Sequence, residues 1–326
     1  MTENWKSALK SALHLTQQNQ LLRHENYSKD AAKLFKPVIT NTVMGNIDWN
    51  NPQDPMLLQF LPHKDELKTP TDYLTDPVGD HPSSPVAGLI HKYHGRVLLI
   101  ASGSCAVNCR YCFRRHYPYT KSFAPRNKWQ AALEYIKNNT SIHEVILSGG
   151  DPLTLDTKTL QQLTQSLNTI DHIKTLRIHS RIPTVLPSRI DKAFLHWSNS
   201  INLNKVMVLH INHASEIDTT SSQAIKRLKQ ANFTLLNQSV VLKDINDHAD
   251  ILTDLSHQLF KHGVMPYYLH VFDKVQNASH FDTSNDSINQ LYQQLQKNLP
   301  GYLLPKLVQE EAGKASKTLV TPFATS

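Results

Sequence analysis

The sequence is short of cysteine, and this scarcity is informative. Its 326 residues contain three cysteines, all between positions 105 and 112. An odd, clustered set in a chain of this length is not a disulfide framework. Such a set fits a chain that works in a reducing compartment, so we expect a cytoplasmic protein.

Long apolar runs and blocks of basic charge are also missing. No run of about 18 apolar residues is present, and the polar N-terminus lacks the apolar core of a signal peptide. The formal net charge is +7, but no Lys/Arg block reaches about five residues. We therefore expect a globular protein with no membrane span and no direct nucleic-acid partner.

The chain divides into three parts by its residue pattern. Residues 1–90 are polar and mixed, with helices expected near 5–20 and 27–34 and a loop-rich wrap over 52–85. From there on, short apolar runs alternate with amphipathic segments, which is typical of parallel strands in βαβ units. The expected strand and helix pairs are 97–101 with 128–138, 144–147 with 158–167, 175–178 with 189–197, 206–211 with 221–230, 235–242 with 251–261, and 266–272 with 288–299. These six units predict an α/β fold built as a partial (β/α)6 barrel over 91–275, followed by a C-terminal segment, 276–326.

The cysteines carry the strongest chemical signal. Cys105, Cys109 and Cys112 have the spacing C-x3-C-x2-C and directly follow the first expected strand. Barrel enzymes place their active sites in the loops at the carboxyl ends of strands. Thiolates bind iron–sulfur clusters, and a cubane cluster normally takes four of them. With three cysteines in the chain, one iron is left for a bidentate ligand, and the amino and carboxylate groups of S-adenosylmethionine suit it.

Two other interpretations of the cysteines stay open at this point. Together with His116 they could form a Cys3His zinc site, or they could be ordinary buried thiols. Structural zinc sites usually use two separated pairs of ligands, whereas this sequence has one compact group.

A second motif makes the chain resemble the radical S-adenosylmethionine superfamily. It is the turn Ser148-Gly149-Gly150-Asp151 at the end of the second expected strand. The resemblance implies that this turn contacts the amino group of S-adenosylmethionine, because glycine lets the backbone approach a ligand closely.

Longer segments are similar to the lysine 2,3-aminomutase family within that superfamily. The similar segments are 88–93 with Arg96, 112–115, 177–189, 210–213, 237–239, 246–247, 266–268 and 279–281. The likeness is greatest to the shorter subfamily that makes β-lysine for the modification of elongation factor P. That likeness rests on 268–276, on 301–307 and on a tail that stops nine residues after Lys317.

The resemblance implies how the cofactors are held. It places pyridoxal phosphate on Lys317, with Lys314 and Lys306 as rival lysines. It implies that Tyr93 and Arg96 contact that cofactor, Arg96 at the phosphate. The two residues that it places along the adenosylmethionine site are His210 and Gln238.

The resemblance also implies the substrate and the reaction. Arg114 matches the arginine that pairs with the substrate carboxylate, and a guanidinium fork suits that task. Asp273 and Glu310 match the acids that bind the ε-ammonium group, Glu310 standing where the family has aspartate. We therefore expect an isomerase that converts L-α-lysine to (R)-β-lysine with a [4Fe-4S] cluster, S-adenosylmethionine and pyridoxal phosphate.

The expected partners follow from the subfamily. The expected small-molecule partner is the substrate L-lysine. The expected pathway partners are elongation factor P and its lysyl ligase. The family also allows the chain to form a homo-oligomer. Alternatives are a 2,3-aminomutase for glutamate or another amino acid, a non-catalytic iron–sulfur sensor, and a zinc protein. Asp273 favours a substrate with a cationic side chain, as lysine has. Whether the substrate lysine is free or attached to a carrier protein stays open.

Overall fold

One sheet organises the molecule. The computed structural model describes residues 5–12, 21–119 and 128–321, and in these ranges nine strands form a single sheet in sequence order. Strands β2 to β8 are parallel neighbours, while β1 and β9 pair antiparallel at the two edges. The strands are β1 Leu89–Tyr93, β2 Arg96–Ser102, β3 Glu144–Gly149, β4 Thr175–Ser180, β5 Asn204–His210, β6 Thr234–Val240, β7 Met265–His270, β8 Lys306–Gln309 and β9 Thr318–Leu319.

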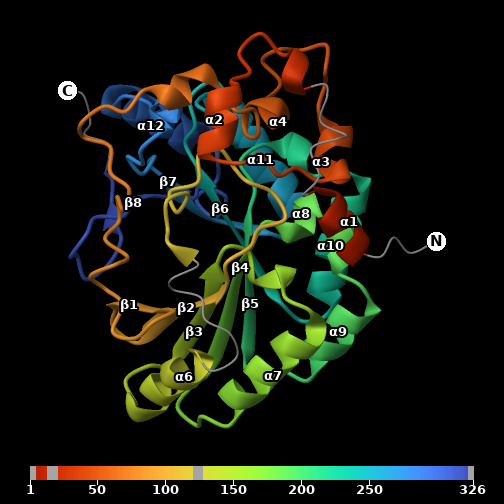
Figure 1. The fold of residues 1–326 in the computed structure, drawn as a ribbon, viewed down its shortest axis with the longest axis vertical. Coiled ribbons are helices and arrows are strands. Elements are labelled where there is room, and N and C mark those ends of the chain that lie inside the picture. The colour runs from red at the N-terminus through yellow and green to blue at the C-terminus, as the bar shows by residue number, and fades with distance from the viewer. Residues whose placement is uncertain (1–4, 13–20, 120–127, 322–326) are drawn as a thin grey trace.

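Helices connect the parallel strands, and Figure 1 shows α7, α9 and α10 along the outer side of β4 and β5. Side chains at the N-caps of α7, α9, α10 and α12 accept hydrogen bonds from first-turn amides, which fixes where these helices begin. The helices are α1 Trp5–Ala12, α2 Lys29–Leu34, α3 Asn41–Asn46, α4 Pro55–Leu58, α6 Lys128–Asn138, α7 Thr157–Asn168, α8 Ile182–Val185, α9 Lys192–Asn199, α10 Thr219–Gln230, α11 Ala249–Lys261 and α12 Asn285–Asn298. Short 3-10 turns include η3 Lys64–Leu67, η4 Pro152–Thr154, η6 Ala214–Glu216 and η7 Ser279–Phe281.

The six predicted strand and helix pairs are confirmed, each within a few residues. The expected first helix is present as α1, and positions 13–20 lie outside the described residues. Strands β1, β8 and β9 were not expected. The β8 segment has two buried residues between exposed ends, so its sequence is too short to carry a strand pattern.

The strands present two different faces. Along β4, Leu176 and Ile178 are buried in the main core, while Arg177 and His179, which alternate with them, are half-buried. Neighbouring strands keep this alternation in register, so that His210 pairs with Gln238 and Gln238 with Tyr268. One face of the sheet therefore packs apolar side chains against the helices, and the other gathers polar side chains on its inner side.

The residues before β1 are tied to the loop that follows β2. Glu66 in η3 is fully buried and pairs with Arg110 at 2.6 Å and with Arg115 at 2.7 Å. Arg110 also donates to the carbonyl of Phe35. These contacts hold the N-terminal part against the cysteine loop, defined here as residues 103–119.

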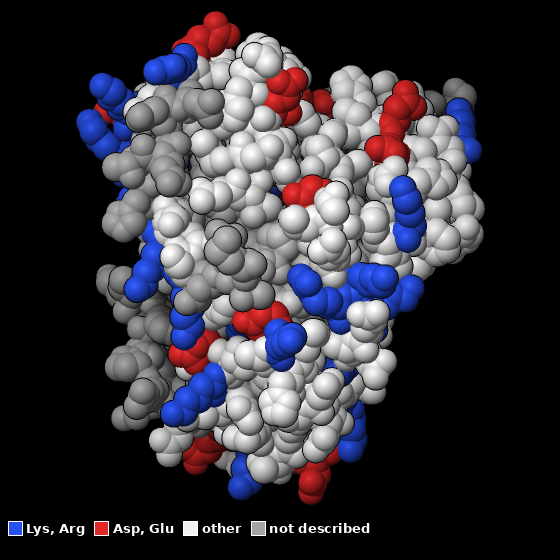
Figure 2. Space-filling model, turned by 90° about the vertical axis from the view of Figure 1, so that its right-hand side faces the viewer, with Lys and Arg blue, Asp and Glu red and all other residues white. Residues whose placement is uncertain are grey.

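The surface charge is mixed on the face that Figure 2 shows, where Lys and Arg side chains lie in small groups among Asp, Glu and uncharged residues. In the described part of the chain, no helix is both long and apolar enough to cross a membrane.

Candidate active site

The cysteine loop brings its three thiols together. Burial and then the neighbouring thiol of Cys112 raise the pKa of Cys105, and burial and then Cys109 raise the pKa of Cys112 to about 11. Each of the three cysteines is free and half-buried. The mutual influence means that the three thiols lie near one another on this loop.

Among the described residues, no group of three or more His, Cys, Asp or Glu side chains could hold a metal ion. The Nε2 atom of His116, the fourth ligand of the zinc interpretation, hydrogen-bonds the carbonyl of Gln276 at 3.2 Å.

The glycine turn packs directly on the cysteine loop. The amide of Gly150 donates to the carbonyl of Ser102 at 2.7 Å, and Gly149 has a φ of 114°. A Cβ atom on Gly150 would lie 2.4 Å from the carbonyl oxygen of Ser104. The turn therefore needs glycine in order to dock on the loop backbone, in addition to any approach to a ligand.

Asp151 joins the ends of β3 and β4. Its buried carboxylate accepts from Ser180 Oγ at 2.9 Å, from the Arg181 amide at 2.8 Å and from the Leu153 amide at 3.0 Å. Burial raises the pKa of this carboxyl, against the effect of these donors. The side chain thus positions the carboxyl ends of two strands beside the cysteine loop.

A chain of ion pairs runs from the cysteine loop to the C-terminal lysine. Arg114 Nε pairs with Asp80 Oδ2 at 2.7 Å, and Asp80 Oδ1 pairs with Lys92 Nζ at 2.6 Å. Lys92 also pairs with Glu310 Oε1 at 2.8 Å, and the other oxygen of Glu310 contacts Lys317 Nζ. The predicted residues Arg114, Glu310 and Lys317 are thus brought together. Asp80 and Lys92, which link them, were not predicted.

The two acids at this site differ in charge state. Burial alone would raise the pKa of Glu310, but Lys317 and Lys92 outweigh it and lower the pKa to about 2. Burial and then the charge of Glu310 raise the pKa of Asp273 to about 7. Among the described residues, no basic side chain forms a salt bridge with Asp273.

Tyr93 and Arg96 lie at the other end of the strands. Arg96 begins β2, whose carboxyl end carries the cysteine loop, and its guanidinium stacks over the Tyr93 ring at 4.8 Å. Burial, followed by the charge of Glu310, raises the pKa of Tyr93. Tyr93 and Arg96 are therefore separated from the cysteines by the length of β2, but Tyr93 lies close to Glu310.

Three histidines on the inner face have free ring nitrogens. His179, His210 and His270 each keep an Nε2 atom that is shielded from solvent and has no hydrogen-bond partner. Burial, and then nearby cations, lower the pKa of His210 and of His270 to about 3, so both rings are neutral. Orphaned polar atoms of this kind fit a polar ligand on this face. Gln238 lies beside His210 in the sheet register.

Ser148, the remaining predicted residue, is buried at the end of β3, and its Oγ lies 3.5 Å from Arg114 Nη1. Sequence reasoning missed His179, His270 and Arg181. All three stand at the carboxyl ends of parallel strands, and this position is the signal that could have found them.

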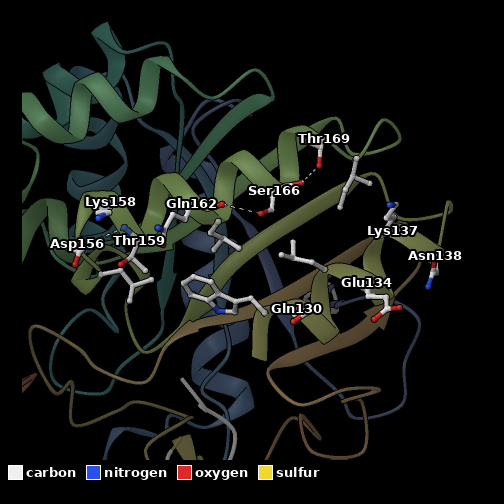
Figure 3. A pocket seen from close by; sticks show the side chains of 15 residues that line it. Gln130, Glu134, Lys137, Asn138, Asp156, Lys158, Thr159, Gln162, Ser166 and Thr169 are labelled. Carbon is white, nitrogen blue, oxygen red and sulfur yellow. Dashed lines mark hydrogen bonds between the residues drawn. The ribbon is translucent and has the colours of Figure 1, made fainter. Parts of the chain in front are cut away.

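One surface cavity lies away from these residues. This pocket has a volume of about 990 Å³ and is lined by Trp129, Leu133 and Leu163 among others. Figure 3 shows it between α6 and α7, with Gln130 and Glu134 on one side and Gln162 and Ser166 on the other. None of the predicted site residues lines it.

Comparison with known proteins now defines the class. A family model described as a 4Fe-4S single cluster domain matches residues 94–180, the segment from β2 to β4 that holds the three cysteines and the glycine turn. Fold and site therefore define an α/β protein with an iron–sulfur cluster domain.

Full-length relatives define the family. The chain is 44% identical over 324 residues to the L-lysine 2,3-aminomutase of Escherichia coli strain K12, covering 97% of this chain and 94% of the relative. The identity to the Haemophilus influenzae protein of the same name is also 44%, over 97% and 95% of the two chains. The Clostridium subterminale L-lysine 2,3-aminomutase is 34% identical over 89% of this chain and 70% of its own length. The chain belongs to the lysine 2,3-aminomutase family and is an enzyme of the isomerase class, as the resemblance implied.

Proposed function

We propose that the chain converts L-α-lysine into (R)-β-lysine by moving the amino group to the neighbouring carbon. The observation that carries the proposal is the ion-pair chain from Arg114, two residues after Cys112, to Lys317. This chain of ion pairs links the cysteine loop to Lys317, the proposed cofactor lysine. It includes Arg114 and Glu310, which are proposed to bind the two ends of the substrate.

Three cofactors are part of the proposal. Cys105, Cys109 and Cys112 would hold a [4Fe-4S] cluster, with S-adenosylmethionine beside His210, Gln238 and the turn 148–151. When bound, the cluster with S-adenosylmethionine supplies a radical that removes hydrogen, and pyridoxal phosphate supplies an aldehyde for the amine and a ring that spreads spin. The converging thiols and the unpartnered histidine nitrogens support a polar ligand here.

Lys317 is the proposed attachment point for pyridoxal phosphate. Its side chain is 20% exposed and lies against Glu310, whereas Lys314 and Lys306 are exposed. Nζ must lose its proton before it can act as a nucleophile. The Glu310 carboxylate holds Nζ in place. When Lys317 loses its charge, Lys92 remains as the cation that pairs with Glu310. Tyr93 and Arg96 would contact the cofactor, Arg96 at its phosphate.

The substrate would lie between a cation and two acids. Arg114 donates its Nε to Asp80 and its Nη1 to Ser148 Oγ, which leaves its Nη2 for the substrate carboxylate. Asp273 and Glu310 would bind the ε-ammonium, and the contact of Glu310 with Lys317 already pairs it with a primary ammonium. Two acids at this end disfavour glutamate, the main alternative substrate, because its side-chain carboxylate would be repelled.

The finer assignments belong to the same proposal. They are a partial (β/α)6 barrel over 91–275, an N-terminal wrap over 1–90 and a cofactor-bearing segment over 276–326. The proposal also includes a cytoplasmic enzyme that supplies the modification of elongation factor P through its lysyl ligase. The sequential order of the parallel strands and the 44% identity to relatives of similar length support these assignments.

The test compares two lysines that lie three residues apart. Purified anaerobically and supplied with pyridoxal phosphate, Lys317→Ala is expected to lose the absorbance of bound cofactor and at least 100-fold of β-lysine formation, because it loses the nucleophile. The iron content should not change. The control Lys314→Ala, at an exposed position, should keep both signals. Full β-lysine formation by Lys317→Ala would show that another lysine carries the cofactor.

A further inference from the structure

Cys109 Sγ lies beside a buried arginine and a tyrosine. Arg181 Nη1 donates to Cys109 Sγ at 2.8 Å. The same nitrogen donates to the hydroxyl of Tyr111 at 2.5 Å, and Tyr111 stands two residues after Cys109 on the loop. The guanidinium therefore bridges one of the three sulfurs and the phenol of Tyr111.

The hydroxyl of Tyr111 is oriented by the groups around it. It accepts from Arg181 Nη1 and also from Asn212 Nδ2 at 2.6 Å. Because both of these groups can only donate, the hydroxyl's own hydrogen must point to an acceptor. Cys109 Sγ and this hydroxyl bond the same nitrogen of Arg181, so the sulfur lies beside the hydroxyl as an acceptor.

Arg181 is held rigidly in this position. Its Nη2 donates to Glu216 Oε2 at 2.8 Å and to Gln59 Oε1 at 2.6 Å. The guanidinium also lies 4.8 Å above the Phe60 ring. Arg181, Glu216 and Gln59 are all buried, so this charge is shielded from solvent and cannot swing away.

We propose that Arg181 and Tyr111 set the reduction potential of the cluster through Cys109. The inference rests on the proposed function, because it requires the cluster on the three cysteines. Reduction adds one electron from an external one-electron donor and no proton, so the sulfurs become more negative. Hydrogen bonds and a fixed positive charge at a ligand sulfur stabilise the reduced state more than the oxidised state, which raises the potential. Their effect is large because the site is buried.

The experiment measures the potential without turnover. Wild type, Tyr111→Phe, Arg181→Met and the control Tyr119→Phe are reconstituted with iron and sulfide. Each is titrated with dithionite under electron paramagnetic resonance, in the absence of S-adenosylmethionine. Tyr119 is a matched control because it lies on the same loop but donates to the Gly149 carbonyl at 2.7 Å.

The expected results are ordered. Arg181→Met should lower the ratio of reduced to oxidised cluster at a fixed potential by about tenfold, which equals about 59 mV for one electron. Tyr111→Phe should shift the ratio in the same direction by less, and Tyr119→Phe should not shift it.

Each contrary result has its own meaning. A wild-type protein that binds no cluster would overturn the proposed function. Wild type and variants with equal cluster content and equal potentials would overturn the inference alone. If Arg181→Met fails to hold a cluster, the comparison of Tyr111→Phe with Tyr119→Phe decides the question, since each removes one oxygen.

Discussion

At the scale of residues, the charge of Asp273 is the feature of the site most sensitive to pH. Burial and Glu310 hold its pKa near 7, against an ordinary value of 3.8. Below that pKa the carboxyl is neutral and cannot attract an ammonium group. Binding of a cationic substrate should therefore strengthen as the pH rises through 7, and KM for lysine should fall.

Asp273→Asn tests this charge through stability. Between the two pKa values the folded protein keeps a proton that the unfolded chain releases, so the stability contribution of Asp273 falls as pH rises from about 4 to about 7. The variant loses this penalty, and its melting temperature without substrate should exceed that of wild type by several degrees at about pH 8. The gain should shrink toward about pH 5.

Thermal melts across this pH range, with Asp30→Asn as an exposed control, check the prediction. A constant difference at all pH values would rule out an abnormal pKa at Asp273.

Some residue roles could be predicted from the sequence, and others needed the fold. Arg114, Glu310 and Lys317 were found by resemblance, and the structure brings them together. Asp80 and Lys92 were missed because a charged residue in a loop or an edge strand looks like solvated surface. Their pairing spans positions 80, 92 and 310, and no local pattern records such a contact.

At the scale of elements, the site depends on a turn docked on a loop. The turn at the end of β3 approaches the cysteine loop so closely that Gly150 has no room for a side chain. The strands and helices around it were predictable, because each has a clear apolar period. The docking was not predictable, since it depends on backbone atoms of Ser102 and Ser104 some 45 residues earlier in the chain.

Gly150→Ala should therefore destabilise the protein by about 1–3 kcal/mol and lower its iron content, because the loop backbone must shift. The control is Gly301→Ala, where an added Cβ atom would meet nothing within 4 Å. That variant should stay within about 0.5 kcal/mol of wild type. Urea unfolding and iron analysis measure both effects, and equal behaviour of the two variants would contradict the docking account.

At the scale of the whole molecule, the sheet brings residues from distant parts of the sequence to one site. Strands β2 to β8 lie side by side in chain order, so residues from positions 105 to 317 reach one inner face. The N-terminal part completes it through Glu66 and its two arginines. The six strand and helix pairs made this architecture predictable. Strands β8 and β9 were not predictable, because they are too short to show a pattern.

The most direct test of the account follows one nitrogen atom. Reduced enzyme with S-adenosylmethionine and pyridoxal phosphate is given L-lysine with a heavy-nitrogen label on its α-amino group, and the products are separated by isomer and weighed. The account predicts (R)-β-lysine that keeps the label, because the amino group moves within one molecule. No β-lysine, or β-lysine whose label is lost to solvent ammonia, would contradict it.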